Sequence, residues 1–587
     1  MKKYLVLLLT SLIMILGCSK EKEGDVVKTP EEPVPEQNVA QNTQEPQNEY
    51  LLPAAIDLTK PNPALNRADS ENTLVVGYSE AAGNFLPIFY ATAYDAPAPA
   101  LVFEGLLKTD ERGEYEPSLA ESLPEISEDG KTYTFKIKEG IKFNSGNPLT
   151  ADDVVFTYAT ISDPAYDGRF TSTVQDLVGY EEYSKGETTI FEGVEKIDDY
   201  TVKFHFKENL VTNILKTGFS IMDSKFYAHD IGDMEPVKSK MQQLSGTGPY
   251  KLEKFVPRQY FELVINEDYH GEKPKIKRII VKSVTSATDV QELINGDVDL
   301  LAGIVEPEKL ELANKTGFID KNQYLRHGYG FLMFNNQDPI LKDKTVRKAL
   351  SYGFDREAVL ALYFKGLGIA IDAPISKAYW TWDEELEKKM IKYNYDPEKA
   401  KAMLEEAGWK LANDGFRYKD NQKFTIEWAT IKDLNFVDTL MPILIANYKD
   451  LGINMIVTPT DFNSLMDKVY NEKKGFSLFN MATSLGTFPD PSSQWHSKYD
   501  IPGASNTGRF RNEKNDELID KLLRTYDREE FKKLWQEWAL LMNEEAPLIP
   551  LYTNIYTDLY NRRIKNFKTD TLYDWTQAVL KAELVKE

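Results

Sequence analysis

Cys18 is the only cysteine among the 587 residues, and it directly follows an apolar leader. The leader opens with two lysines, continues with apolar residues from Leu5 to Leu16, and breaks at Gly17. This order is typical of an export signal and is too short for a membrane-spanning helix. An exported chain with one cysteine forms no internal disulfide. The size and packing of its core must therefore stabilise the fold.

The glycine–cysteine step at the end of the leader has the form of a lipobox. We expect removal of residues 1–17 as a signal peptide and attachment of a diacylglyceryl group, with palmitate, to the sulfur of Cys18. A chance cysteine near the amino terminus is the alternative. Two or more acyl chains anchor a protein stably, whereas one does not. The sequence thus predicts an extracytoplasmic protein, in the periplasm or on the cell surface, that is held to the membrane by lipid.

Residues 18–70 lack the composition of a folded domain. They are rich in Glu, Pro, Gln, Asn and Lys, and the first aromatic residue is Tyr50. Such a segment cannot bury enough apolar surface to offset its chain entropy, so we expect a disordered linker. A chain of some 50 residues has a typical reach of about 40 Å.

The net charge of −22 excludes the usual electrostatic basis for binding nucleic acid or anionic lipid. Apolar residues make up 42% and charged residues 28% of the chain, which is ordinary for a globular protein with a large core. After the leader, no apolar run is long enough to cross a bilayer.

Strand and helix patterns alternate through the remaining body of about 515 residues, which exceeds a single core. Residues 133–137 and 202–206 alternate between apolar and polar side chains and predict half-buried strands. Helices are predicted from an N-cap at Thr150, before a glycine at Gly296, and between Asp396 and Gly408. A further helix carries an apolar stripe that we expect to be core: Phe531, Leu534, Trp535, Trp538, Leu541 and Met542. The pattern indicates a large α/β protein of more than one lobe.

Few residues suggest catalysis. None of the five histidines lies four residues from another, as in a zinc helix, and His205 is expected to be solvated. The chain has no G-x-S-x-G elbow and no phosphate-binding loop, and Lys251 replaces the third glycine of a dinucleotide fingerprint after Gly246 and Gly248. We expect no enzyme activity, no metal and no cofactor. An anchored hydrolase with a carboxylate pair is the alternative.

A series of segments shares its order and residue pattern with one family across nearly the whole body. The segments are 101–107, 117–122, 129–135, 146–154, 246–252, 295–299, 346–350, 355–356, 395–397, 407–409 and 547–551. Together they resemble the bacterial extracellular solute-binding proteins of family 5, which include oligopeptide-binding lipoproteins.

The resemblance implies an α/β clamshell of the periplasmic-binding-protein type II class, with two lobes and an extra inserted domain. Transferred to this chain, lobe I comprises residues 72–107, 245–329 and 549–587. The inserted domain comprises residues 108–244, and lobe II comprises residues 330–548. Hinge strands would connect the lobes, which would close around a ligand.

The resemblance also implies that a monomeric protein captures peptides and delivers them to the permease subunits of an ABC transporter. An extended peptide can be held largely through backbone hydrogen bonds while wet pockets accept any side chain. Alternatives are a non-peptide solute such as a sugar, a nickel complex or haem, and a sensor or chaperone with the same clamshell.

One departure from the family pattern concerns the amino terminus of the ligand. In peptide-binding relatives, an aspartate three residues before a D/E-P pair forms a salt bridge with the peptide ammonium group. Here the pair is Asp490-Pro491, and Thr487 stands three residues earlier. Threonine supplies no counter-charge, and loss of one partner of a buried pair costs about 3–5 kcal/mol. Either another acid takes this role, with Asp490 and Asp95 as candidates, or the ligand presents no free amino group.

Aromatic residues make up 12% of the chain and are suited to lining a ligand site by stacking. Trp380 and Trp382 lie between predicted helices, and Tyr94 precedes the first family segment; core or surface packing is an equal alternative for each. The predicted ligand-binding residues are Thr487, Phe488, Asp490, Tyr94, Asp95, Trp380 and Trp382.

Overall fold

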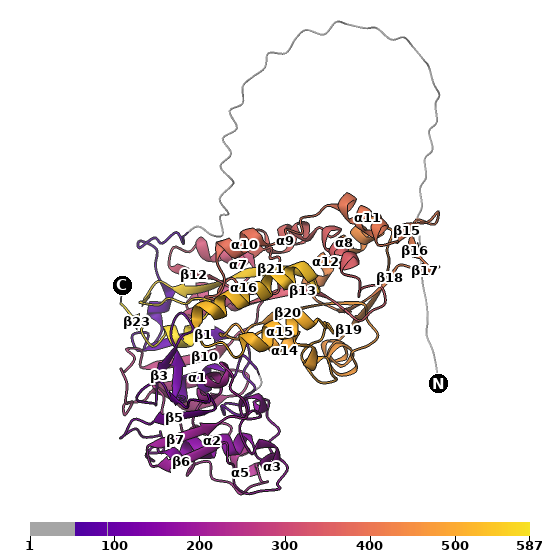
Figure 1. Ribbon diagram of the computed structural model, residues 1–587. Coiled ribbons are helices and arrows are strands. Elements are labelled where there is room, and N and C mark those ends of the chain that lie inside the picture. Colours follow the sequence, from indigo (N-terminus) through magenta and orange to yellow (C-terminus); the bar gives the residue numbers. More distant parts are fainter. Residues whose placement is uncertain (1–52, 91, 587) are drawn as a thin grey trace, which may run out of the picture. The chain divides into compact units, whose positions relative to one another are not determined.

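The computed structural model describes residues 53–90 and 92–586 (Figure 1). The predictions for the signal peptide, Cys18 and most of the linker lie outside these residues. We use the names lobe I, inserted domain and lobe II for the ranges given above, whose limits stay a prediction.

A twelve-stranded sheet runs through lobe I and lobe II in the order β19-β18-β20-β13-β21-β11-β1-β10-β9-β8, with β12 and β14 also paired to β21. Its strands are β1 (Thr73–Tyr78), β8 (Tyr250–Val256), β9 (Tyr260–Ile265), β10 (Arg278–Ser283), β11 (Leu300–Ile304), β12 (Ile319–Leu325), β13 (Gly328–Phe334), β14 (Gly368–Ile369), β18 (Thr425–Ile431), β19 (Asn454–Thr460), β20 (Leu478–Ser484) and β21 (Leu548–Asn561).

Strand β21 joins the two lobes, since its first part pairs with β13 and its second part pairs with β11 and β12. Strands β12 and β13 follow one another along β21 and are both antiparallel to it. Between them, the Arg326 amide donates to the carbonyl oxygen of Asn554 at 2.8 Å, and the Thr553 hydroxyl donates to the carbonyl oxygen of Arg326 at 3.1 Å. Two antiparallel chain segments therefore connect the lobes.

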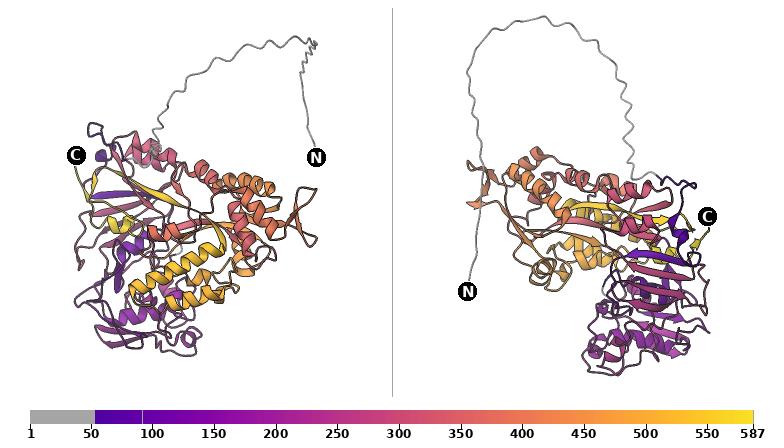
Figure 2. Two further views of the ribbon diagram at one scale, coloured as in Figure 1. Left: turned by 45° about the horizontal axis from the view of Figure 1, so that its top comes forward. Right: turned by 180° about the vertical axis from the view of Figure 1, so that it is seen from behind.

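Both faces of the lobe II sheet are covered by helices, and residues of β13 alternate between them (Figures 1 and 2). Leu332 and Phe334 pack in a cluster with α8 (Lys344–Tyr352), α9 (Arg356–Phe364), α11 (Pro397–Glu406) and α12 (Asn435–Asp450). Phe331 and Met333 pack in a second cluster with α15 (Glu513–Leu522) and α16 (Arg528–Glu545). The α16 stripe is buried as predicted, except that Leu541 is half-buried.

The inserted domain has a four-stranded sheet in the order β4 (Glu125–Ile126), β5 (Thr132–Lys136), β7 (Thr201–His205) and β6 (Val194–Asp198). Strands β5 and β7 confirm the predicted alternation. Helix α2 (Ala151–Ile161) begins with the predicted capping box between Thr150 and Asp153. The hairpin of β2 (Leu107–Thr109) and β3 (Tyr115–Pro117) leads from lobe I into this domain. One apolar cluster continues from Leu101 and Leu107 to Tyr133 and Phe204, so lobe I and the inserted domain share a core.

The predicted helix ends are also present. Helix α6 (Asp289–Asn295) ends at Gly296, and a glycine follows α11 at Gly408; both glycines have a positive φ, which non-glycine residues rarely adopt. The remaining elements are α1 (Pro97–Val102), α3 (Tyr180–Ser184), α4 (Asn213–Thr217), α5 (Glu235–Lys238), α7 (Pro307–Asn314), α10 (Glu384–Lys389), α13 (Phe462–Met466), α14 (Ser492–Trp495), α17 (Trp575–Ala578), β15 (Lys410–Leu411), β16 (Arg417–Lys419), β17 (Gln422–Lys423), β22 (Ile564–Lys565) and β23 (Glu583–Leu584).

Several segments of the family resemblance hold the framework together. Asp299 is fully buried, and its carboxylate accepts hydrogen bonds from Arg563 at 2.8 and 2.9 Å and from the Val75 amide at 2.9 Å. The buried Arg347 guanidinium donates to the carbonyl oxygens of Glu545 and Ala546 at the end of α16. Asp299 and Arg347 each have hydrogen-bond partners within the core, so neither charged group is available to bind a ligand.

The predicted linker extends too far toward the folded body. Residues 57–70 lie against lobe I: Ala64 is fully buried, Asn62 exchanges side-chain hydrogen bonds with Asn561, and Arg67 forms an ion pair with Asp299. The linker prediction rested on a composition rich in polar residues and proline. Composition does not reveal that Arg67 pairs with a buried carboxylate elsewhere in the chain. Within the part of the chain that the structure describes, no helix combines the length and apolar character needed to cross a membrane.

Candidate functional site

The parallel strands of the two lobes indicate where a ligand binds. Strand β1 is parallel to β10 and β11, and β18 is parallel to β19 and β20. In open α/β sheets, ligands bind outside the carboxyl ends of such strands. In lobe II, β20 ends at Ser484 and is followed by residues 485–491, which include three of the predicted site residues.

The backbone of segment 485–491 is tied to the chain that connects the lobes. His327 lies between β12 and β13, and its Nε2 is 2.7 Å from the carbonyl oxygen of Gly486. The Tyr379 hydroxyl donates to the same oxygen at 2.9 Å, and the Leu485 amide donates to the carbonyl oxygen of His327 at 3.0 Å. Burial lowers the pKa of His327, so its neutral ring is favoured and Nε2 is the donor. These bonds hold the segment in one position.

Thr487 is exposed and faces the inserted domain. Burial raises the pKa of Tyr115 of β3 to about 12, and the side chain of Thr487 acts in the opposite direction. Thr487 also lies beside Gly113, where an added Cβ would be 3.8 Å from the Thr487 Cβ. Thr487 stands in the family's ammonium-binding position. Its neighbours in the inserted domain are Tyr115 and Gly113, and neither of them is acidic.

Asp490 lines a pocket of about 240 Å³ in lobe II, together with Tyr379, Trp495, Trp535 and Trp538. Its Oδ1 accepts a hydrogen bond from the Ser492 amide at 2.8 Å. A carboxylate beside indole rings suits a cationic or apolar group.

Trp380 lines a second pocket, of about 680 Å³, which all three parts of the folded body share. The Arg528 guanidinium lies 4.2 Å from the Trp380 ring centroid, and Arg528 forms an ion pair with Glu114 of the inserted domain at 2.5 Å. The pocket is lined by Glu111, Arg112, Glu114, Leu325, Ala378, Trp380, Arg528, Asp570, Thr571 and Leu572.

The other predicted site residues have different surroundings. Phe488 packs edge-to-face on Phe531 at 5.2 Å, and Trp382 donates its Nε1 hydrogen to Glu387 at 3.3 Å. Tyr94 is exposed and lies edge-to-face with Tyr78, the last residue of β1, at 5.8 Å.

Asp95 is fully buried within lobe I. Its carboxylate accepts hydrogen bonds from the Gly83 amide at 2.9 Å and the Thr92 hydroxyl at 3.0 Å. Asp95 therefore holds a turn inside lobe I, and its fully buried carboxylate presents no surface to a ligand ammonium group. No observation tests directly whether any of the predicted residues contacts a ligand, so these assignments stay predictions.

Sequence reasoning did not single out Lys216, which is the only charged residue between Leu210 and Met222. Its side chain is 16% exposed and forms an ion pair with Asp176. Burial lowers the pKa of Lys216 to about 8, and the charge of Asp490 acts in the opposite direction.

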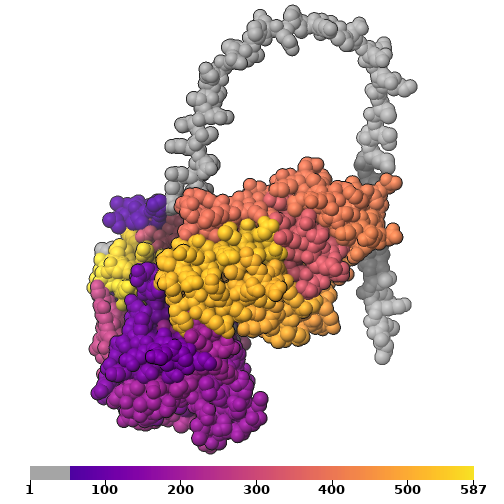
Figure 3. Space-filling model, viewed as in Figure 1, coloured from indigo at the N-terminus to yellow at the C-terminus, as the bar shows by residue number. Residues whose placement is uncertain are grey.

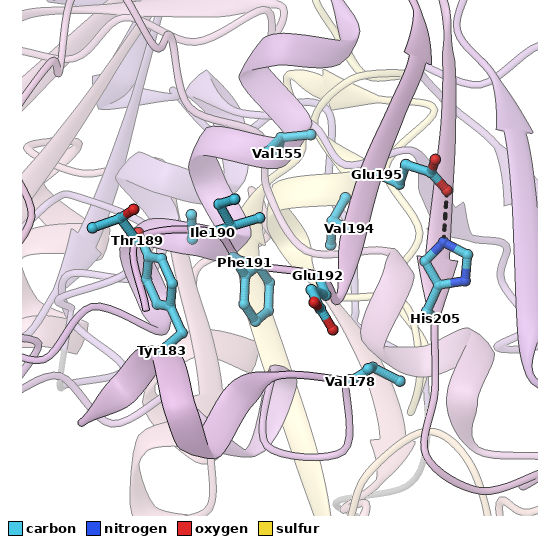
Figure 4. Close-up of a pocket in the computed structure, with 11 residues that line it drawn as sticks. Val155, Val178, Tyr183, Thr189, Ile190, Phe191, Glu192, Val194, Glu195 and His205 are labelled. Carbon is cyan, nitrogen blue, oxygen red and sulfur yellow. Dashed lines mark hydrogen bonds and ion pairs between the residues drawn. The ribbon is translucent and has the colours of Figure 1, made fainter. Parts of the chain in front are cut away.

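A larger pocket, of about 760 Å³, lies within the inserted domain (Figure 4). Its lining includes Val155, Tyr183 and Phe191, and at one end Glu195 and His205 are 2.9 Å apart. His205 was predicted to be solvated, but it is half-buried and pairs with Glu195. The pocket takes no residue from the carboxyl ends of β1, β18 or β20, so we do not assign the ligand to it. Among the described residues, no group of three or more His, Cys, Asp or Glu side chains is arranged to hold a metal ion.

Comparison with known proteins identifies the family. The family model for bacterial extracellular solute-binding proteins, family 5, matches residues 114–505, more than half of the chain. The chain belongs to this family. Solute-binding protein family 5 is the family that the sequence resemblance named, and that prediction is confirmed.

Two curated relatives illustrate the range of the family. Oligopeptide-binding protein AppA of Bacillus subtilis is 29% identical over 457 residues, which cover 77% of this chain and 80% of AppA. Heme-binding protein A of Haemophilus influenzae is 24% identical over 526 residues, which cover 85% of this chain and 90% of that protein.

A solved structure of AppA from Bacillus subtilis, in complex with a nonapeptide, matches with a TM-score of 0.70 at 26% identity. The match covers 88% of this chain and 99% of that chain. This likeness confirms the predicted α/β clamshell fold of the family.

Proposed function

We propose that this family 5 protein captures peptides outside the cytoplasm and delivers them to the permease of an ABC transporter. The observation that carries the proposal is the likeness to AppA, whose solved structure holds a nonapeptide. The arrangement of this chain supports it, because segment 485–491 follows β20 at the carboxyl ends of parallel strands and is tied to the connection between the lobes.

A backbone-directed mode of binding suits such a site. Peptides of many sequences can be held as an added strand, while roomy pockets accept their side chains with bridging water. The pockets at Asp490 and at Trp380, of about 240 and 680 Å³, provide such space.

The ligand leaves the protein chemically unchanged in this proposal. Purified protein incubated with a peptide mixture should retain about one peptide per molecule, and mass spectrometry should detect no new fragments. More than one fragment formed per protein molecule would instead support the alternative of an anchored hydrolase.

Anchoring through Cys18 is a separate part of the proposal and rests on the lipobox pattern alone. The variant Cys18→Ala should appear in the soluble fraction, with a thermal unfolding transition like that of the lipid-free body. If Cys18→Ala resists extraction by high salt and alkaline washes, lipid on Cys18 is not the anchor.

A further inference from the structure

Apart from the strands that connect the lobes, a second contact joins the inserted domain to lobe II. The Val211 amide of the inserted domain donates a hydrogen bond to the carbonyl oxygen of Leu523 at 2.8 Å, in the connection between α15 and α16. Leu210 and Val211 also pack against the apolar cluster of these two helices. In Figure 3 the inserted domain (purple) accordingly meets the surface of the helical pair (gold).

Two side-chain pairs flank this backbone bond. Nη2 of Arg524 donates to Oε2 of Glu208 at 2.9 Å. The Tyr526 hydroxyl donates to Oδ1 of Asn209 at 2.5 Å. The inserted domain thus contributes one short segment, and lobe II contributes the turn that precedes α16. We call residues 208–211 and 523–528 together the clasp.

A third pair connects the clasp to the pocket of about 680 Å³. Arg528, the first residue of α16, forms an ion pair with Glu114 of the inserted domain at 2.5 Å, and both residues line this pocket. Leu325, the last residue of β12, lines the same pocket beside the chain that connects the lobes. The pocket is therefore bounded both by the connection between the lobes and by the clasp.

The contacts of the clasp are suited to opening and closing. The side chains of Arg524 and Glu208 are 52% and 64% exposed, and exposed ion pairs contribute little to stability and weaken with salt. Lobe I and the inserted domain, in contrast, share one apolar core. Separation at the clasp consequently costs far less than separation of the inserted domain from lobe I.

We propose that the clasp holds the clamshell closed around its ligand and opens when the ligand leaves. Lobe I and the inserted domain move together, and lobe II turns about the strands that connect the lobes. A bound ligand favours the closed state, and the clasp adds contacts that exist only in that state. This role in retaining the ligand rests on the proposed peptide-binding function.

The Val211 amide reports directly on the clasp, because its hydrogen bond crosses from the inserted domain to lobe II. Exchange of this hydrogen requires the clasp to open. A saturating pool of nonapeptides of mixed sequence should slow exchange at Val211 in the wild-type protein about tenfold, since binding shifts the population toward the closed state. Exchange at Phe206 should stay unchanged, because its amide donates to Lys131 within the inserted domain. Peptide binding that leaves exchange at Val211 unchanged would overturn the inference.

A variant of the clasp tests its effect on ligand release. Arg524→Gln/Tyr526→Phe removes one ion pair and one hydroxyl group, and neither residue lines the pockets at Asp490 and Trp380. The variant should release the nonapeptides about threefold to thirtyfold faster than the wild type, as expected for one exposed ion pair and one hydrogen bond. Native mass spectrometry measures this rate after an excess of the isotope-labelled pool is added.

Lys207→Gln/Tyr418→Phe is the matched control. It also removes an exposed ion pair and a tyrosine hydroxyl group, but the partners Glu181 and Asp414 each lie in the same part of the body as the residue they bind. The control should release the nonapeptides at the wild-type rate.

Equal release rates for the clasp variant and the control would overturn the inference while the peptide function stands. The exchange measurement on the wild type decides the matter if the clasp variant fails to fold. If the nonapeptide pool does not bind to the wild-type protein, the proposed peptide function itself is contradicted, and the inference falls with it.

Discussion

His327 Nε2 lies 2.7 Å from the carbonyl oxygen of Gly486, so the chain that connects the two lobes holds the segment that carries Thr487 and Asp490. We expect closure of the lobes to be coupled through this bond to the position of these two residues. In binding proteins of this kind, hinge residues absorb the backbone rotation that encloses a ligand.

The His327 ring should make stability depend on pH. Burial lowers its folded pKa below the ordinary value of 6.5, so the unfolded chain binds a proton more readily. The stabilisation is fully present above pH 6.5 and is lost as pH falls through the folded pKa. Urea unfolding of the wild type and His327→Gln should therefore differ in slope against pH below 6.5. Parallel pH profiles of the two proteins would show that the ring does not titrate differently on folding.

The buried pair of Asp299 and Arg563 should be essential to lobe I. Arg563→Met removes two hydrogen bonds to a fully buried carboxylate that keeps Arg67 as its other cationic partner, and we expect a loss of about 1.5–3 kcal/mol in the free energy of unfolding. Chemical denaturation measures this loss. Lys365→Met is the control, because it breaks an exposed pair with Glu308 and should hardly move the unfolding midpoint. Similar midpoints for both variants would rule out this role of Asp299.

The contact between Tyr526 and Asn209 should protect the backbone of the inserted domain. Tyr526→Phe removes the hydroxyl group that donates to Asn209, and hydrogen exchange at the Val211 amide should become faster because this contact opens more often. Tyr418→Phe removes a comparable hydroxyl group bonded to the exposed Asp414 and should leave Val211 unaffected. Unchanged exchange at Val211 in Tyr526→Phe would show that the bond adds nothing to this contact.

An acid at position 487 should create selectivity for free amino termini. If the peptide amino terminus lies at the family's position, Thr487→Asp adds a charge-assisted hydrogen bond of about 1.5–3 kcal/mol, or about tenfold to a hundredfold in affinity. The gain should be absent for acetylated peptides and should weaken as pH rises past the α-amino pKa near 8. Calorimetry with one free and acetylated pair measures it. Equal gains for both peptides, or none, would mean that position 487 does not face an amino terminus.

The sequence predicted the framework well because local patterns determine much of it. The alternation at Tyr133 and Phe135 and the capping box at Thr150 depend on residues a few positions apart, and the structure has both. Asp299 and Arg347 lie in segments of the family resemblance, and both form hydrogen bonds within the core. Such segments therefore predict the fold of the chain better than they predict which ligand it binds.

The site was harder to predict because it depends on contacts between distant parts of the chain. Asp95 was a candidate for the ligand ammonium, but its carboxylate is buried in a turn with Gly83 and Thr92. Arg67 was assigned to the linker for the same reason, because its partner is more than 200 positions away in the chain.

Native mass spectrometry of the protein purified without added ligand tests the central proposal most directly. A binding protein that encloses its ligand can retain cargo through purification, so we expect additional mass that dissociates on activation and fragments as a series of peptides. Detection of haem, a metal complex or a sugar as the retained species, with no peptide bound even after incubation with a peptide mixture, would contradict the account.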